Sequence, residues 1–293
     1  MAYTTIDDGS AHFHTQIYTG NGSSGLSITN DANAGDFQPD LLWISPRSNG
    51  DNSVIWDSSR TSAKRLKANG TDAEDSDGTA LVTFESDGFD LDTTDTNFNG
   101  SSRTYVAWQW KANGGSTTTN DASATSVGSI DSVYQANTTA GFSVVTYTGT
   151  GSAATVAHGL GVKPEWIVIK NRGKDEGWAV YHGANTSAPE TDGLSLNSNN
   201  ATNDDSDYWN DVAPTTTTFS VSGDDRSGGS YNFVAYVFNS VQGYSKFGSY
   251  TGNGDTDGTF VYLGFKPAFL IIKILVKFFL HLQLMLKQHQ QII

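Results

Sequence analysis

The stretch "FHTQIYTGNG" (residues 13–22) carries the pattern that decides the fold: β-branched and aromatic residues leading into a glycine-containing turn. Its last five residues, "YTGNG", recur unchanged at 250–254, and "YTGTG" occurs at 147–151 after the similar run "FSVV" (142–145). Glycine permits the backbone conformations that a tight turn after a strand requires. Each phrase therefore predicts the end of a β-strand, and the repetition indicates several copies of one domain.

Other features recur in the same order after each phrase. "FQPDLLWIS" (37–45) corresponds to "VKPEWIVIK" (162–170), and "YVAWQW" (105–110) corresponds to "FVAYVF" (233–238). After the third phrase, "FKPAFLIIK" (265–273) matches the first of these pairs. The shared order predicts two full copies and the beginning of a third.

The apolar runs "LLWI" (41–44) and "WIVI" (166–169) show too little alternation for strands with one face in water. They are typical of central strands that are buried on both faces. Gly-, Asn-, Asp- and Ser-rich turns separate the runs within each copy, a pattern that favours two antiparallel sheets packed as a sandwich. We therefore predict an all-β protein of tandem antiparallel β-sandwich repeats, jelly-roll-like, with a truncated third repeat. A more barrel-like arrangement of the sheets remains an alternative.

The repeats and the composition between them predict the domain boundaries. In the third copy, the apolar runs "FVYLGF" (260–265) and "FLII" (269–272) would lack a partner sheet. The predicted parts are an N-terminal segment (1–11), repeat 1 (12–111), a flexible or extended polar linker (112–140), repeat 2 (141–246), the start of repeat 3 (247–273) and an aberrant tail (274–293).

The tail "ILVKFFLHLQLMLKQHQQII" (274–293) has none of the Gly, Ser, Thr, Asn, Asp and Glu that dominate the sequence before it. A membrane anchor would need about 20 predominantly apolar residues, and Lys273, Lys277 and His281 interrupt this stretch. An amphipathic helix for a partner is a second interpretation. We favour a third, a reading-frame slip within repeat 3, and expect no membrane contact.

The balance of acidic and basic residues restricts the classes of molecule that the protein could bind. Seventeen basic and 31 acidic residues give a formal net charge of −14, which argues against binding nucleic acid. The chain has no cysteine, and its N-terminus shows no secretory signal. We interpret the basic run "RTSAKRLK" (60–67) and the acidic run "DAEDSDG" (72–78) as solvated edges and loops.

No catalytic residue, metal site or cofactor is predicted, because no zinc-binding, phosphate-loop or nucleophile-elbow motif occurs. The weak metal candidate is the trio Asn253, Asp255 and Asp257, which resembles the start of a calcium loop. Gly264 stands where such a loop needs a glutamate, so a plain turn is favoured.

Exposed aromatic rings could stack on the apolar faces of sugars. Trp56, Trp178 and Trp209 lie nearest to predicted loops and are the weak candidates for a glycan site. The tryptophans within strand-like runs are expected in the core, namely Trp43, Trp108, Trp110 and Trp166.

Four phrases, "YTGNG", "YVAWQWKANG" (105–114), "HGLGVKPEWIVIKNR" (158–172) and "GYSKFGSYTGNGDTDGTFVYLGFKPAF" (243–269), carry a resemblance over residues 2–273. The chain resembles an uncharacterised tandem-repeat β-domain family of tailed, especially marine, bacteriophages. The resemblance implies a non-enzymatic, tail-fibre-like virion protein, made in the host cytoplasm and located in the virion tail. Its partners would be other tail proteins or host-surface glycans, and it could form a homotrimer by analogy with other fibres. The alternatives are a carbohydrate-binding or adhesin module of a cell-surface protein and a polysaccharide depolymerase.

Overall fold

The computed structural model describes residues 4, 6–31, 35–61, 63–75, 81–275 and 289–292. Short β-strands dominate these ranges, and the few helices have at most four residues. Every pairing between two named strands is antiparallel. The prediction of an all-β, antiparallel protein is confirmed.

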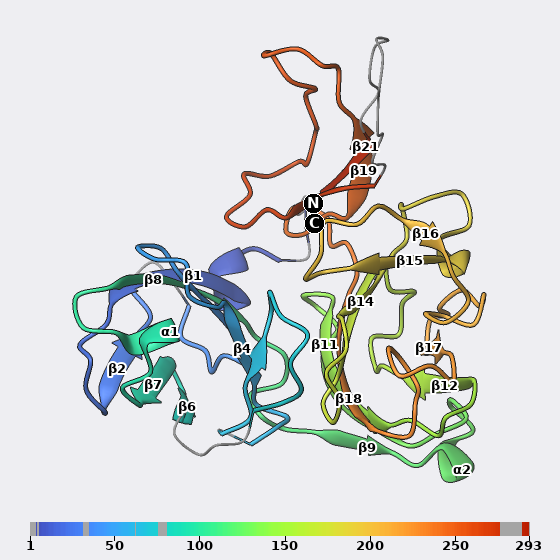
Figure 1. Cartoon of the computed structure of the whole chain (residues 1–293), viewed down its shortest axis with the longest axis horizontal. Coiled ribbons are helices and arrows are strands. Elements are labelled where there is room, and N and C mark those ends of the chain that lie inside the picture. Colours follow the sequence, from blue (N-terminus) through green and yellow to red (C-terminus); the bar gives the residue numbers. More distant parts are fainter. Residues whose placement is uncertain are drawn as a thin grey trace.

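The first half of the chain forms two sheets, which we call the first sandwich (Figure 1). In sheet order, the larger sheet contains β1 (Phe13–Thr19), β8 (Thr104–Trp110), β3 (Leu41–Pro46), β4 (Val54–Asp57) and β5 (Leu66–Lys67). The smaller sheet contains β2 (Leu26–Thr29), β7 (Gly88–Asp92) and β6 (Leu81–Glu85), and the short helices are η1 (Gly9–Ala11) and α1 (Thr96–Asn99).

The second half forms another pair of sheets, the second sandwich. In sheet order, its larger sheet contains β16 (Asn203–Asp204), β15 (Asp192–Ser195), β14 (Ala179–His182), β13 (Trp166–Asn171), β18 (Asn232–Phe238), β11 (Phe142–Thr148), β10 (Ser132–Asn137) and β9 (Thr118–Asn120). Its smaller sheet contains β12 (Ala154–Ala157) and β17 (Thr218–Val221), and the short helices are α2 (Ala122–Thr125) and η2 (Pro189–Thr191).

The two sandwiches share one strand order, because β1-β8-β3-β4-β5 corresponds to β11-β18-β13-β14-β15. The register corresponds as well. Leu41 lies opposite Trp110 on one side and Asp57 on the other. Trp166 likewise lies opposite Phe238 on one side and His182 on the other. The two sandwiches therefore agree in strand order and register, and their interpretation as copies of one domain stays a prediction.

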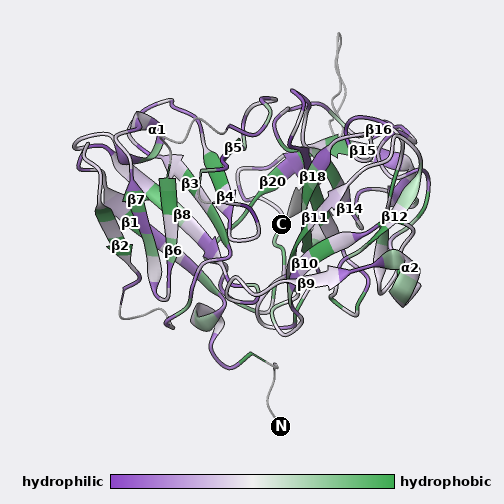
Figure 2. Ribbon diagram, turned by 90° about the horizontal axis from the view of Figure 1, so that it is seen from below, coloured by the Kyte–Doolittle hydropathy of each residue, from purple (hydrophilic) through white to green (hydrophobic). Residues whose placement is uncertain are grey.

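The sheets stack in layers, and the two large sheets face each other in the middle (Figure 2). Successive side chains of a strand point to opposite faces. Leu42 and Ile44 therefore pack within the first sandwich, whereas Leu41 packs against residues of the second sandwich. The apolar cluster between the large sheets, here the inter-sandwich core, includes Leu41, Ile55, Leu66, Trp110, Phe142, Val144, Trp166, Val168, Trp178, Val180, Val234, Tyr236 and Phe238. The run "LLWI" is apolar throughout because a second layer covers each face.

The segment 112–140, predicted to be a flexible or extended polar linker, is extended and joins a sheet. It contributes β9 and β10, and β10 pairs with β11 from Ser132–Tyr147 to Asn137–Phe142. The segment thus widens the large sheet of the second sandwich. Its polar composition reflects a position at the sheet edge, where one side of the strands stays accessible.

The C-terminal segment forms a fifth sheet among the described residues, with the order β19-β21-β20, which projects from the two sandwiches (Figure 1). Its strands are β19 (Gly248–Thr251), β21 (His289–Ile292) and β20 (Ile272–Ile274). Most of the predicted tail, 276–288 and 293, lies outside the described residues, so its three interpretations stay predictions. In the described part of the chain, no helix has the length and apolar character needed to cross a membrane.

Candidate functional site

The repeated Tyr-Thr-Gly phrase forms the same structural corner in both sandwiches. The Tyr18 hydroxyl donates a hydrogen bond to the Phe98 carbonyl at 2.7 Å, and the Tyr147 hydroxyl donates to the Ser227 carbonyl at 2.5 Å. The Tyr147 ring also stacks on Phe233, with 5.2 Å between ring centroids. Because both tyrosines are buried, their side chains serve the fold and offer no surface to a ligand.

The glycine after each of these corners is required by close backbone packing. A Cβ atom at Gly20 would lie 2.4 Å from the Gly100 carbonyl oxygen, and one at Gly149 would lie 2.2 Å from that of Gly229. Real Cβ atoms do not approach an oxygen so closely. The sequence signal "YTG" therefore combines a buried anchor with a residue that lets two loops touch.

The calcium candidate forms a hydrogen-bonded turn. Asn253 Oδ1 accepts from the Asp255 amide at 3.1 Å, and Asp255 Oδ1 accepts from the Asp257 amide at 3.3 Å. The bond from the Asp257 amide is the main cause that lowers the pKa of Asp255. These oxygens already serve backbone amides, as is usual in Asx turns. Within the described ranges, no three His, Cys, Asp or Glu side chains gather in a way that could hold a metal ion.

The glycan candidates need a correction, because their indole rings are buried. Trp56 and Trp178 are 0 % exposed and Trp209 is 1 % exposed. Trp178 Nε1 donates to the Lys67 carbonyl of the first sandwich at 2.9 Å, and Trp209 Nε1 donates to the Asp192 carbonyl at 3.0 Å. Nearness to loops was misleading, since β4 and β14 are only four residues long and still lie within the layers.

The partly accessible tryptophans are instead two of those expected in the core. Trp43 and Trp108 are half-buried and lie edge to face at 5.8 Å between ring centroids. Phe269 from the C-terminal segment packs against both rings, at 6.2 Å and 5.1 Å, and against Trp110 at 5.2 Å. This aromatic cluster is where the C-terminal segment meets the inter-sandwich core.

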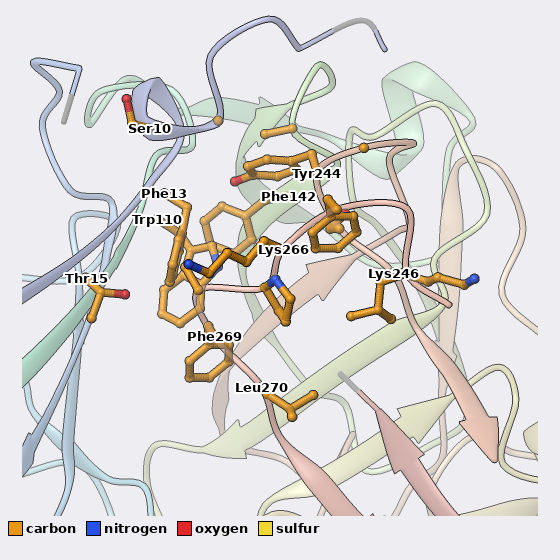
Figure 3. Close-up of a pocket in the computed structure, with 18 of the residues that line it drawn as sticks. Ser10, Phe13, Thr15, Trp110, Phe142, Tyr244, Lys246, Lys266, Phe269 and Leu270 are labelled. Carbon is orange, nitrogen blue, oxygen red and sulfur yellow. The ribbon is translucent and has the colours of Figure 1, made fainter. Parts of the chain in front are cut away.

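Beside this cluster lies a cavity of about 460 Å³, which we call the junction pocket (Figure 3). Both sandwiches and the C-terminal segment line it. Its walls are mainly aromatic: Phe13, Trp110, Phe142, Trp166, Phe238, Tyr244, Phe247, Phe265 and Phe269. Pockets of this size, mostly apolar with a few polar groups, are typical small-ligand sites.

The polar groups of the junction pocket could orient a ligand. His14, Lys246 and Lys266 also line it. Two buried polar atoms of its lining, Thr15 Oγ1 and Trp166 Nε1, have no hydrogen-bond partner among the described residues. Buried polar groups are nearly always hydrogen-bonded, so these two atoms are exceptions, and the polar groups that a ligand could reach are those of His14, Lys246 and Lys266. No sequence pattern indicated this site, because its walls come from three distant segments.

A second polar feature, the interface ion cluster, joins the two sandwiches. Arg60 contacts Asp57 at 2.6 Å and Glu74 at 2.8 Å. Glu74 in turn pairs with Arg172 of the second sandwich at 2.7 Å, and the Tyr236 hydroxyl donates to Asp57 at 2.7 Å. The cluster corrects the interpretation of Arg60 and Glu74 as solvated, since the Arg60 side chain is fully buried and that of Glu74 is 7 % exposed. Asp72 is solvated as predicted, with 53 % of its side chain exposed, and residues 62 and 76–78 of these runs lie outside the described residues.

The ion cluster keeps its charges despite its burial. Burial alone would lower the pKa of Arg60, but Asp57, Tyr236 and Glu74 outweigh it and raise that pKa. Burial would likewise raise the pKa of Glu74, but Arg172 and Arg60 lower it. These opposite shifts favour the charged forms of both partners. The cluster is a fixed electrostatic link between the sandwiches.

Lys170 is a further buried charge at the same interface. Its Nζ donates to the carbonyls of Thr71, Asn171 and Glu176 at 3.0, 3.1 and 2.8 Å. Burial lowers its pKa to about 8. Because all three bonds of the ammonium group end on backbone carbonyls, Lys170 fixes the loop at Thr71 of the first sandwich onto the second.

Residues 8–277 match the protein family described as "Domain of unknown function (DUF7483)". The chain belongs to this family. The DUF7483 match runs continuously through both sandwiches and the C-terminal segment to the beginning of the tail. No curated protein and no solved structure matches the chain.

Proposed function

We propose that the protein is a non-enzymatic structural protein of a bacteriophage virion, tail-fibre-like, which binds the host surface or other tail proteins. The sequence resemblance is the reason for proposing a location in the virion tail. The observation that carries the structural role is the rigid connection between the two sandwiches, which share one aromatic core and one buried ion cluster.

This connection is unusual for neighbouring domains of one chain. Interfaces between such domains are mostly polar and allow relative motion. Here Leu41, Trp110, Trp166 and Phe238 are buried in the inter-sandwich core. Breaking the interface would expose these large apolar surfaces and separate Glu74 from Arg172 and Asp57 from Tyr236. A tail component must hold a binding surface in a fixed orientation while the particle diffuses, and a body without a hinge meets that requirement.

Mass spectrometry of purified phage particles tests the proposal. We expect peptides from both sandwiches in particles that survive density-gradient purification. Antibodies against the recombinant chain should label the tail in electron micrographs and slow adsorption to the host. Particles without this chain would refute the proposal.

The second candidate, a carbohydrate-binding module, is favoured by the junction pocket. Its aromatic rings could pack on the apolar faces of a pyranose, while the side chains of His14, Lys246 and Lys266 could bind its hydroxyl groups. Both proposals can hold together, since a tail protein that binds host glycans needs such a site.

Tryptophan fluorescence of the full chain tests the second candidate, because Trp110 and Trp166 line the junction pocket. Titration with hexoses, N-acetylhexosamines, uronic acids and sialic acid should give saturable quenching with at least one sugar class. His14→Ala removes one of the polar side chains that line the pocket and should weaken that binding at least threefold. Thr19→Val, an exposed change outside the pocket on the same strand, is the matched control. No response from any sugar at millimolar concentration would reject the candidate.

A further inference from the structure

A second cavity, also of about 460 Å³, lies at the end of the second sandwich where β13 begins. Lys163, Glu165, Gly183, Ser240 and Phe247 are among the residues that line it. We call it the Glu165 pocket. Its volume falls within the range of small-ligand sites.

The first sandwich has a carboxylate at the position that corresponds to Glu165. Asp40 directly precedes β3 and Glu165 directly precedes β13, and these two strands occupy the same place in the strand order. The Asp40 amide donates to the Trp110 carbonyl at 2.8 Å. The Glu165 amide donates to the Phe238 carbonyl at the same distance. The two acidic residues can therefore be compared directly.

The Asp40 carboxylate is buried and bound by donors from its own sandwich. It accepts from the Ser58 hydroxyl at 2.6 Å and from the Ala112 amide at 2.7 Å. The amides of Gly114 and Gly115 donate at 2.8 and 2.7 Å, the first to Oδ2 and the second to Oδ1. A carboxylate has about four acceptor positions, so these donors satisfy it, and the two glycine amides bind its two oxygens as a pair.

Gly183 removes the hydroxyl donor from the second sandwich. Its amide donates to the Glu165 carbonyl at 2.7 Å, as the Ser58 amide donates to the Asp40 carbonyl at 3.0 Å. Gly183 therefore takes the place of Ser58 but has no hydroxyl group. A Cβ atom at Gly183 would lie 3.5 Å from its nearest neighbour, the Glu165 carbonyl oxygen, so the position has room for a serine.

The pair of glycine amides has no counterpart either. The Ser240 amide donates to Glu165 Oε2 at 2.5 Å, as the Ala112 amide donates to Asp40. Beyond Ser240 the chain forms a different turn, in which the Ser245 amide donates to the Val241 carbonyl at 2.9 Å. Among the described residues, the Ser240 amide is the single hydrogen-bond donor to the Glu165 carboxylate. This carboxylate therefore lines a pocket with acceptor positions that the chain leaves unfilled.

We propose that the Glu165 pocket binds a neutral sugar through a vicinal diol, whose two hydroxyl groups donate to the two oxygens of Glu165 as the paired amides do to Asp40. Hydrogen bonds to a charged acceptor are stronger than bonds between neutral groups. The half-buried Phe247 ring lines the same pocket and offers an apolar surface to the sugar ring. Lys163 also lines it, and its positive charge disfavours a cationic ligand. This inference deepens the carbohydrate-binding proposal and rests on it, but it assigns polar groups other than those of the junction pocket.

Saturation-transfer NMR titration of the full chain tests the inference. The probes are the methyl glycosides of glucose, galactose and mannose, which all carry a vicinal diol. We expect saturable binding of at least one of them. The same glycoside with every hydroxyl group methylated cannot donate a hydrogen bond and should not bind. Equal binding of the methylated glycoside would overturn the inference.

Variants of the chain locate the site. Glu165→Gln keeps an oxygen for the Ser240 amide but loses the charge and one acceptor, so it should weaken binding at least tenfold. Glu85→Gln, the same change at an exposed glutamate of β6, is the matched control and should bind normally. Gly183→Ser supplies the hydroxyl that Ser58 provides in the first sandwich and should weaken binding at least fivefold by occupying the carboxylate. Gly183→Ala adds the Cβ atom alone and should change the affinity less than twofold.

The outcomes separate this inference from the proposal on which it rests. Binding that neither Glu165→Gln nor Gly183→Ser weakens would overturn the inference. Weaker binding to His14→Ala would then place the sugar in the junction pocket and leave the carbohydrate-binding proposal standing. No binding of any sugar would reject both. Tighter binding of methylguanidinium than of any glycoside, lost in Glu165→Gln, would also overturn the inference, because the pocket would then be a site for a cation.

Discussion

Two buried tyrosines of the second sandwich core provide the sharpest test of the structure. Tyr147 and Tyr181 both lie in that core, at 5 % and 1 % exposure. The Tyr147 hydroxyl donates to the Ser227 carbonyl, whereas the Tyr181 hydroxyl has no hydrogen-bond partner among the described residues. Burial raises the pKa of both phenols, that of Tyr181 to about 12. Replacing either residue by phenylalanine removes one oxygen atom and nothing else.

The expected free-energy changes differ in sign. Tyr147→Phe removes a buried hydrogen bond and leaves the Ser227 carbonyl without its donor, a loss worth about 1–2 kcal/mol of unfolding free energy. Tyr181→Phe removes a buried hydroxyl that no partner compensates, so the unfolding free energy should stay unchanged or rise by up to about 1 kcal/mol. Tyr18→Phe should repeat the loss of Tyr147→Phe, because Tyr18 forms the equivalent bond in the first sandwich.

Thermal and urea unfolding followed by far-UV circular dichroism measures these differences. For a domain of 150–250 residues, 1 kcal/mol shifts the melting temperature by about 2–4 °C. The melting temperature of Tyr147→Phe should therefore fall by about 2–8 °C, while that of Tyr181→Phe should not fall. Equal destabilisation by both variants would refute the assignment of the Tyr147 hydroxyl as the structural anchor of the repeated phrase.

Three further changes test the close approach, the ion cluster and the pH response. Gly149→Ala should destabilise the chain strongly, because a Cβ atom there meets a carbonyl oxygen. Gly161 has a positive φ, but a Cβ atom there meets no neighbouring atom, so Gly161→Ala should lower the free energy of unfolding by only about 1 kcal/mol. Urea unfolding compares the two variants. Glu74→Ala should lower the free energy of unfolding by about 3–5 kcal/mol, because it leaves buried Arg60 with one carboxylate fewer. Asp72→Ala removes an exposed ion pair and should lower the free energy of unfolding by less than about 1 kcal/mol. Burial lowers the pKa of His158 from 6.5 to about 4, so between these pH values the unfolded chain binds a proton that the folded chain does not. The free energy of unfolding should therefore fall by about 3 kcal/mol from pH 6.5 to pH 4. A His158→Gln variant that loses as much stability over that range would contradict this prediction.

The fold class could be predicted because its signals are local. Runs such as "LLWI" and "WIVI" lack polar alternation, which predicted burial on both faces. A proline, Pro39 or Pro164, precedes each of these runs, and an aromatic strand follows each of them in the same order. This shared order indicated two copies of one domain. These features depend only on residues close together in the chain, so a single sequence displays them.

The charged runs could not be interpreted in the same way. Arg60 and Glu74 lie in two separate runs that each look solvated, and Glu74 also pairs with Arg172, which is 98 residues away. Whether a charge is solvated or buried depends on what packs over it, and the second sandwich packs over these. The tryptophans were misjudged for the same reason, since Trp178 lies near a loop but is covered by the first sandwich through its bond to the Lys67 carbonyl.

The β class, and the strand and turn glycines of the repeated phrase, follow from the amino-acid sequence alone, because side-chain alternation and backbone freedom are properties of short segments. Long-range packing was needed to establish that the sandwiches pack back to back, that 112–140 joins a sheet, and that a pocket opens where three segments meet. It also decided that Leu270 and Ile272 remain exposed while Leu42 and Ile44 are buried. Burial is set by the layer that covers a strand, and a sequence pattern shows which face needs such a layer without showing what provides it.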